Sequence, residues 1–166
     1  IEYAYSQMAV AAGIEMMPCR LFEEGRRAHF MTKRFDRESS SDGESKRHFA
    51  SLFGLGHFAY AAPGSHCHSY EDYIELMAKL SLTPEERLEA YRRMVFNVLA
   101  CNCDDHPKNF GVLMGERGQW ELSPAFDVTY AYNPAPGKWT ASQQMSVLGK
   151  REQITRKDLL EFGLQR

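Results

Sequence analysis

The chain has 166 residues, of which 43% are hydrophobic and 25% charged, the composition of one globular domain with a real core. A formal net charge of −2 gives no electrostatic reason to expect direct nucleic-acid binding, and no apolar run approaches the roughly 20 residues of a membrane span. No signal peptide is visible, and a chain of this size does not need disulfides, so we expect the four cysteines to be reduced thiols of a cytoplasmic protein. Because helical patterns begin directly at Ile1 and are still running at Arg166, we expect the chain to be a piece of a longer protein.

The first 37 residues predict a helix followed by a β-hairpin. Helix formers fill Glu2–Ala12, and two segments with strand character, 18–23 and 27–36, flank a short turn. The second segment ends in Lys33-Arg34-Phe35-Asp36-Arg37. Residues 38–45, which include four serines and a glycine, predict a loop.

The middle of the chain predicts helices of different lengths. Residues 46–53 predict a short helix, and residues 57–68 look irregular. Ser69 followed by Asp72 is a capping pattern, which predicts a helix from Tyr70 to about Leu80.

The longest predicted helix begins after Thr83, a capping residue that is followed by Pro84 at the first helical position and Glu86 at the third. The pattern continues to about Ala100. We expect the buried stripe of this helix to consist of the apolar residues at helical spacing, namely Leu88, Tyr91, Val95, Val98 and Leu99.

A dense polar segment, Asp104-Asp105-His106-Pro107-Lys108-Asn109, follows directly. Such groups are costly to bury unpaired, so at the end of a buried helix they usually face a site or a solvent-filled cleft. Residues 110–114 and 119–122 then predict a hairpin, and Asp127 follows eighteen residues after Asn109. The hairpin can therefore return Asp127 to the neighbourhood of Asn109.

The C-terminal part predicts a polar loop over residues 131–142 and a last helix. Thr155 followed by Asp158 marks the start of this helix. We expect its apolar side to consist of Leu159, Leu160 and Phe162.

Phosphoryl transfer is the chemistry that best fits the order of polar residues. A kinase needs a carboxylate beside the attacking hydroxyl, and an amide five residues later with a second carboxylate to hold Mg²⁺. Asp104, Asn109 and Asp127 have this spacing, and oxygen ligands suit Mg²⁺. The position of His106, two residues after Asp104, is similar to the Asp-x-His-x-x-Asn arrangement of atypical and lipid-type kinases.

Simpler interpretations of the same residues stay open. Asp104 and Asn109 could cap backbone groups in a turn at the helix end, and Asp105 could be structural. His106 could orient Asp104 by a hydrogen bond, and Lys108 could be a solvated surface lysine.

Rival sites and functions also stay open. His66-Cys67-His68 and Cys101-Asn102-Cys103 offer zinc ligands, although their spacing differs from that of usual zinc sites. A metal-dependent hydrolase would use Asp104, Asp105, His106 and Asp127. A non-catalytic regulatory module that binds a partner is the alternative from a different class.

Three segments together resemble the C-terminal kinase region of the HipA family, the serine/threonine kinases of bacterial toxin–antitoxin systems. They are Lys33-Arg34-Phe35-Asp36-Arg37, Asp104-Asp105-His106-Pro107-Lys108-Asn109 and Leu122-Ser123-Pro124-Ala125-Phe126-Asp127. The stretch from Gly149 to Leu160 is also similar. The resemblance implies an α+β domain, a mostly helical large lobe of a kinase-like fold with a small antiparallel hinge hairpin. Residues 1–37 would form the first helix and the hinge hairpin, and residues 46–166 the large lobe.

The resemblance also implies roles for single residues. Asp104 would be the catalytic carboxylate, and Asn109 and Asp127 would hold Mg²⁺. The other predicted cofactor-binding residues would bind ATP. The backbone of Lys33–Phe35 would form the hinge that binds the adenine, and Asp36 with Arg34 or Arg37 would stabilise this hinge. His106 and Lys108 would lie beside the phosphates.

The family also carries features that this chain does not match. They lie upstream and include a lobe with a phosphate-binding lysine, a loop with an autophosphorylated serine and a region that docks on the antitoxin. We therefore expect the N-terminal lobe to be largely absent from these 166 residues. A Ser/Thr protein substrate and a DNA-binding antitoxin of the HipB type would be partners of the full-length protein, and the chain alone need not be active.

Overall fold

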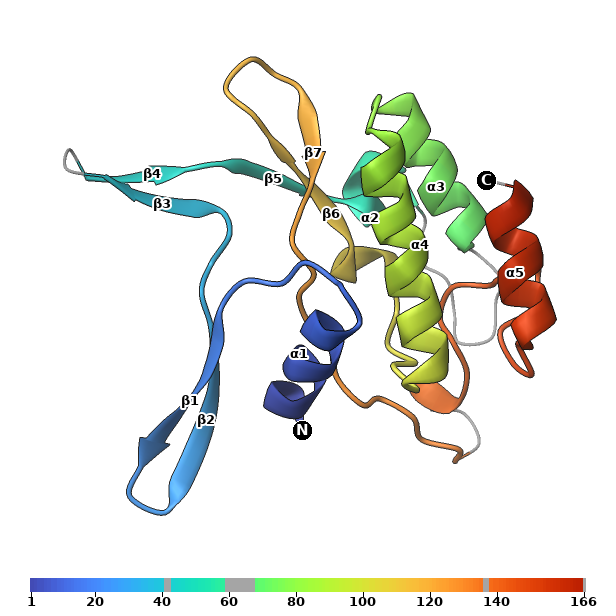
Figure 1. The fold of residues 1–166 in the computed structure, drawn as a ribbon, viewed down its shortest axis with the longest axis horizontal. Coiled ribbons are helices and arrows are strands. Elements are labelled where there is room, and N and C mark those ends of the chain that lie inside the picture. Colours follow the sequence, from blue (N-terminus) through green and yellow to red (C-terminus); the bar gives the residue numbers. More distant parts are fainter. Residues whose placement is uncertain (41–42, 59–67, 136–137, 166) are drawn as a thin grey trace.

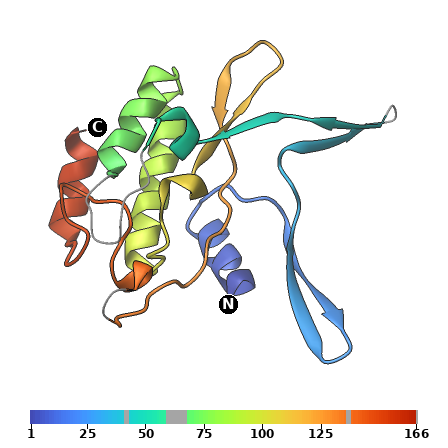
Figure 2. The same ribbon diagram turned by 180° about the vertical axis from the view of Figure 1, so that it is seen from behind.

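The computed structural model describes residues 1–40, 43–58, 68–135 and 138–165. Helices α3, α4 and α5 pack together on one side of the molecule, and two β-hairpins, β1–β2 and β3–β4, project from the other side (Figure 1, Figure 2). The fold is α+β with small antiparallel sheets, as the sequence predicts. In chain order the elements are α1 (Glu2–Ala11), β1 (Cys19–Glu24), β2 (Arg27–Thr32), β3 (Arg37–Ser40), β4 (Gly43–Lys46), β5 (His48–Ser51), α2 (Leu52–Leu55), α3 (Tyr70–Lys79), α4 (Pro84–Leu99), the 3₁₀ turn η1 (Pro107–Asn109), β6 (Gly111–Met114), β7 (Trp120–Leu122), the 3₁₀ turn η2 (Trp139–Ala141) and α5 (Arg156–Gln165).

Two predictions for the segment before α2 are wrong. Residues 38–45, predicted as a loop, contribute to the β3–β4 hairpin, and residues 46–53, predicted as a helix, contain strand β5. β5 pairs with β6, so that Ser51 lies opposite Gly111, and β7 completes this antiparallel sheet on the other side of β6. The strand partner of β5 lies far along the chain, which is why local patterns did not reveal it.

The starts of α3 and α4 are confirmed in detail. The Ser69 side chain accepts from the Asp72 backbone N–H while the Asp72 carboxylate accepts from the Ser69 N–H, and Thr83 and Glu86 form the same capping box. None of the helices in the described part of the chain has the length and apolar character that a membrane crossing requires.

The stripe predicted to be buried on α4 is partly wrong, because Leu88 and Leu99 are 55% and 72% exposed. The buried face instead carries three polar residues, Glu89, Arg93 and Asn97, together with Ala90 and Met94. The polar ones are tolerated there because each has hydrogen-bond partners from distant parts of the chain, as described below.

On α5, Leu160 is 46% exposed, contrary to prediction, whereas Leu159 and Phe162 are buried. The predicted cap of this helix is confirmed, since the Thr155 N–H and hydroxyl both donate to Asp158.

Two groups of buried apolar side chains stabilise the fold. The larger one joins α3, α4, α5 and the β5–β6–β7 sheet around residues such as Tyr70, Met94 and Phe162. The smaller one consists of Ala9, Ile14 and Ala125, with Met16, Phe96 and Val128 packed against it. It attaches the N-terminal segment to the stretch of chain that leads to Asp127.

Candidate active site

The polar segment 104–109 connects α4 to β6 and is closed by a bond across its own loop. The Asn109 side-chain N–H donates to the backbone carbonyl of Asp104 at 3.0 Å. Because the amide nitrogen of Asn109 is used in this way, its oxygen is the end that is left for a ligand.

Asp127 is held in place through the residues that precede it. The Ser123 carbonyl accepts a 2.8 Å bond from the buried Arg93 guanidinium, and the Ala125 N–H donates to the Glu15 carbonyl at 2.8 Å. Asp127 itself has a left-handed φ of 55°, a strained conformation for a residue other than glycine and one that is often found at functional sites. Its carboxylate is exposed and has no hydrogen bond or ion pair to any other residue that the structure describes.

Asn109 and Asp127 line the same small pocket, which also contains Arg93, Asn102 and Asp105. We call it the Asn109–Asp127 pocket. Its volume is about 20 Å³, room for one water molecule or one ion. The two predicted metal ligands, one before β6 and one after β7, therefore line one pocket at the open end of the β6–β7 hairpin, with the oxygen atoms that Mg²⁺ prefers.

A second pocket of about 200 Å³ lies beside the strand end at residues 32–36, and we call it the hinge pocket. Lys33 and Phe35, which belong to the predicted adenine-binding segment, line it. It shares Ala125 and Phe126 with the Asn109–Asp127 pocket, so the two pockets are neighbours on the two sides of this dipeptide.

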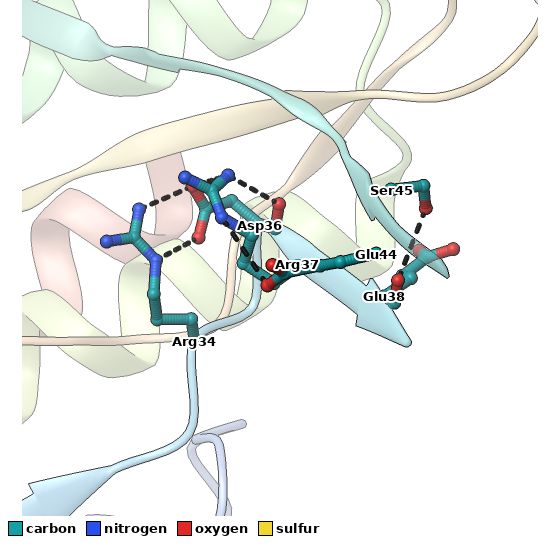
Figure 3. Close-up of polar contacts among 6 residues, drawn as sticks. All are labelled: Arg34, Asp36, Arg37, Glu38, Glu44 and Ser45. Atoms are coloured by element: carbon teal, nitrogen blue, oxygen red, sulfur yellow. Dashed lines mark hydrogen bonds and ion pairs between the residues drawn. The ribbon is translucent and has the colours of Figure 1, made fainter. Parts of the chain in front are cut away.

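The hinge segment is stabilised by charge and by aromatic packing. Arg34 donates two hydrogen bonds to the Asp36 carboxylate, at 2.7 and 2.6 Å, and Arg37 donates a third at 3.0 Å (Figure 3). The Arg34 guanidinium thereby holds the pKa of Asp36 below its usual value. The ring of Phe35 lies 5.4 Å from that of Phe49 and 5.5 Å from that of Phe126.

Three predicted site residues, Asp104, His106 and Lys108, lie outside the described lining of both pockets. The Asp104 side chain is 44% exposed, and its Oδ1 lies 3.7 Å from His106 Nε2. This separation is longer than a hydrogen bond, so both roles of His106, as a partner that orients Asp104 and as a phosphate contact, stay predictions. The Lys108 ammonium lies 5.1 Å from the centre of the Phe53 ring.

Asp105 has the opposite environment to Asp104, since it is 1% exposed and both of its oxygens accept hydrogen bonds, from Tyr70 and from Gln144. Both oxygens of Asp105 thus already have a protein donor, although its side chain borders the Asn109–Asp127 pocket, and the metal-dependent hydrolase stays an alternative prediction. Of the rival zinc ligands, His66 and Cys67 lie outside the described residues. Within the described ranges, no three His, Cys, Asp or Glu side chains are arranged to hold a metal ion.

Sequence reasoning missed Phe126, Phe49 and Arg93 as parts of the site. The two phenylalanines meet only through tertiary contacts. Arg93 follows Glu89 at helical spacing, a pattern that is typical of exposed ion pairs, so nothing in the sequence marked it as buried.

Comparisons with known proteins show the family and the fold of the chain. The family model of the HipA-like C-terminal domain matches residues 1–166. A protein of Sinorhizobium fredii (strain NBRC 101917 / NGR234) named "Putative kinase Y4mE" is 28% identical over 134 residues, which are 76% of this chain and 31% of that protein. A chain of the solved "Shewanella oneidensis MR-1 Toxin Antitoxin System HipA, HipB and its operator DNA complex" has the same fold, with a TM-score of 0.81 at 20% identity over 99% of this chain and 42% of that chain.

The chain thus spans less than half the length of either relative. The resemblance that the three sequence segments indicated is confirmed, because the family match extends over every residue. The protein belongs to the family of HipA-like C-terminal domains.

Proposed function

We propose that the full-length protein is a serine/threonine protein kinase, and that this chain supplies its large lobe and hinge. The observation that supports this most is the adjacency of the two pockets at Ala125 and Phe126. One nucleotide can extend across this dipeptide, with its base at the hinge pocket and its phosphates toward Asn109 and Asp127. ATP is therefore the cofactor we propose.

The residues present also fit a divalent cation. The Asn109 amide oxygen is left for a ligand, and the Asp127 carboxylate is exposed with no partner among the described residues. These two side chains would hold Mg²⁺, which when bound neutralises charge on the nucleotide phosphates. The strained backbone at Asp127 is consistent with a position that is kept for a ligand rather than for stability.

Asp104 would align the hydroxyl of a Ser or Thr side chain and accept its proton. Its partial exposure leaves room for a protein substrate, and the nearby His106 would restrict its orientation. The bond from Asn109 to the Asp104 carbonyl fixes the carboxylate relative to the metal end of the site. Since phosphoryl transfer depends mostly on positioning and charge neutralisation, each of these contacts should matter.

The test is transfer of labelled γ-phosphate by the full-length protein, together with calorimetry of ATP binding in the presence of Mg²⁺. Asp104→Ala and Asp127→Asn are expected to lower transfer by more than about 10²-fold without unfolding the protein. Glu75→Gln removes an exposed α3 carboxylate that pairs with Lys79, and serves as the control. Near-normal transfer in Asp127→Asn would overturn the assignment, and partner binding without nucleotide binding would indicate the non-catalytic module.

A role as the toxin of a toxin–antitoxin system is part of the same proposal. It is supported by the similarity in fold to the Shewanella oneidensis chain, which was solved in a complex of HipA, HipB and operator DNA. The expected partner of the full-length protein is accordingly a DNA-binding antitoxin of the HipB type. Co-purification with the product of the neighbouring gene tests this, and a full-length protein that is harmless to its host without any such partner would contradict it.

A further inference from the structure

Asp105 stands next to the proposed catalytic Asp104, and although it borders the Asn109–Asp127 pocket, both of its oxygens are hydrogen-bonded to other parts of the chain. We infer that the buried Tyr70–Asp105 hydrogen bond is a positioning device that fixes the catalytic loop on α3. Both are positioning residues, because neither is exposed to a substrate. The inference rests on the proposed function for its effect on turnover, while its effect on the loop can be measured without any activity.

The contact between the two side chains is direct and fully buried. The Tyr70 hydroxyl donates to Asp105 Oδ2 at 2.7 Å, and each residue is 1% exposed. The other oxygen of Asp105 accepts from the backbone N–H of Gln144 at 2.5 Å. Asp105 therefore connects the catalytic loop to α3 and to the segment before α5, two parts of the chain far from it in sequence.

The Tyr70 hydroxyl is in turn oriented by α4. Asn97 donates to it at 3.1 Å, so its own hydrogen is directed at Asp105. Asn97 also accepts from the Asn102 side chain at 3.0 Å, which ties the start of the loop to the same group of bonds. A buried network in which the members orient one another specifies a single geometry, and loss of one member is felt by the rest.

This network reaches the catalytic carboxylate through one peptide bond. Asp105, the residue after Asp104, is held by hydrogen bonds from Tyr70 and Gln144. The backbone carbonyl of Asp104 itself accepts a hydrogen bond from the Asn109 side chain. The Asp104 side chain has no comparable bond to any residue that the structure describes, and its Oδ1 lies 3.7 Å from His106 Nε2. The backbone on either side of its Cα therefore contributes to its direction, and the bonds of Asp105 help to set that backbone.

Helix α3 offers a matched pair of variants for the test. Tyr73 lies on the same helix as Tyr70, is also 1% exposed, and has a hydroxyl without any hydrogen-bond partner among the described residues. Tyr70→Phe and Tyr73→Phe thus remove the same atom from equally buried rings, but only the first removes a contact to Asp105.

We expect Tyr70→Phe, made in the full-length protein, to lower kcat for phosphate transfer on the order of 10-fold. The KM for ATP should stay within about 2-fold of the wild-type value, because misplacement of a catalytic group affects the reaction step more than substrate binding. Tyr73→Phe should change neither constant. Asp105→Asn, which keeps the shape and one acceptor, should retain more turnover than Asp105→Ala. Equal kcat in the two tyrosine variants would overturn the inference.

Hydrogen exchange of the loop separates this inference from the proposed function. The backbone amides of residues 104–106, 108 and 109 should exchange faster in Tyr70→Phe than in wild type, with no change in Tyr73→Phe. If the wild-type full-length protein neither binds ATP nor transfers phosphate, the kinase proposal fails, and the exchange comparison still decides whether Tyr70 fixes the loop. Unchanged exchange in Tyr70→Phe would refute the positioning role in either case.

Discussion

The ring of Phe126 lies 5.5 Å from that of Phe35, measured between ring centres, and Asp127 is the next residue after it. The hinge segment and the candidate metal ligand are thus joined by a single aromatic contact. Phe49 of β5 completes the group, 5.8 Å from Phe126. The three rings thus connect the hinge segment to the residue beside Asp127, and this relationship leads to the first prediction.

Phe126→Leu should weaken ATP binding by the full-length protein, because it removes two aromatic contacts worth about 1 kcal/mol each while keeping an apolar side chain. The expected loss of affinity is on the order of 10-fold, measured by calorimetry with Mg²⁺ present. Phe22→Leu, on the exposed β1 strand, is the control. Unaltered ATP affinity in Phe126→Leu would mean that the base does not bind at the hinge pocket.

The buried Glu89–Arg93 pair predicts a large loss of stability when it is broken. Arg93 Nε lies 2.9 Å from Glu89 Oε1, the two side chains are 6% and 11% exposed, and Glu89 also accepts from the Glu15 N–H. Arg93→Met should cost about 3 to 5 kcal/mol of unfolding free energy, since it leaves the buried carboxylate without its buried charged partner.

Arg92→Met is the matched control, because Arg92 contacts the same carboxylate from a side chain that is 39% exposed, and should cost only about 1 kcal/mol. Urea unfolding of the variants measures both values. In the double variant Glu89→Gln/Arg93→Met the two losses should not add, and strict additivity would argue against the pairing.

The burial of Asp105 predicts a specific pH dependence of stability. Burial raises the pKa of this carboxyl to about 7, from 3.8. The folded state therefore binds the proton more tightly than the unfolded state, so the contribution to stability is complete below pH 3.8 and is lost as the pH rises through 7.

Asp105→Asn cannot titrate at this position and should not show that loss. Relative to the variant, the wild type should lose on the order of a few kcal/mol of unfolding free energy between about pH 5 and pH 8. Urea unfolding of both proteins at the two pH values provides the measurement. If the difference in unfolding free energy between wild type and Asp105→Asn is the same at both pH values, the raised pKa is contradicted.

Gly111 of β6 is expected to tolerate no side chain. A Cβ there would lie 2.3 Å from the ring of Phe49 and 2.8 Å from the Ala50 carbonyl, so the ring has to move. Gly111→Ala should cost about 1 to 3 kcal/mol and lower the melting temperature. Gly54→Ala is the control, because its Cβ would meet nothing closer than 3.7 Å in helix α2, and a higher melting temperature is expected there.

The sequence was sufficient for those elements whose signals are local. The capping residues Ser69 and Thr83 predicted the starts of α3 and α4, and the glycines around residues 115–118 predicted the β6–β7 turn. It was not sufficient for β5, whose strand state depends on pairing with β6. The sequence also did not predict the buried face of α4, where Leu88 is exposed and Arg93 is buried. The partners that make the burial of the Arg93 charge tolerable come from distant parts of the chain.

In the candidate site, too, local features could be predicted from the sequence and tertiary contacts could not. Spacing alone predicted that Asn109 and Asp127 would meet, since the hairpin between them is a local structure. The different environments of Asp104 and Asp105 could not be predicted, because adjacent residues of the same type carry no local signal that tells which one faces the core. Only the positions of Tyr70 and Gln144 decide it.

The small apolar cluster around Ile14 limits how far the domain can be shortened. The Tyr5 hydroxyl donates to the Ala100 carbonyl at 2.5 Å, and the Glu15 carbonyl accepts from the N–H of Ala125, just before Asp127. A version of the protein that starts at the hinge would leave that N–H without its acceptor and uncover the apolar surface beneath α1. Although every proposed site residue lies after position 32, a minimal folded unit has to include the first helix.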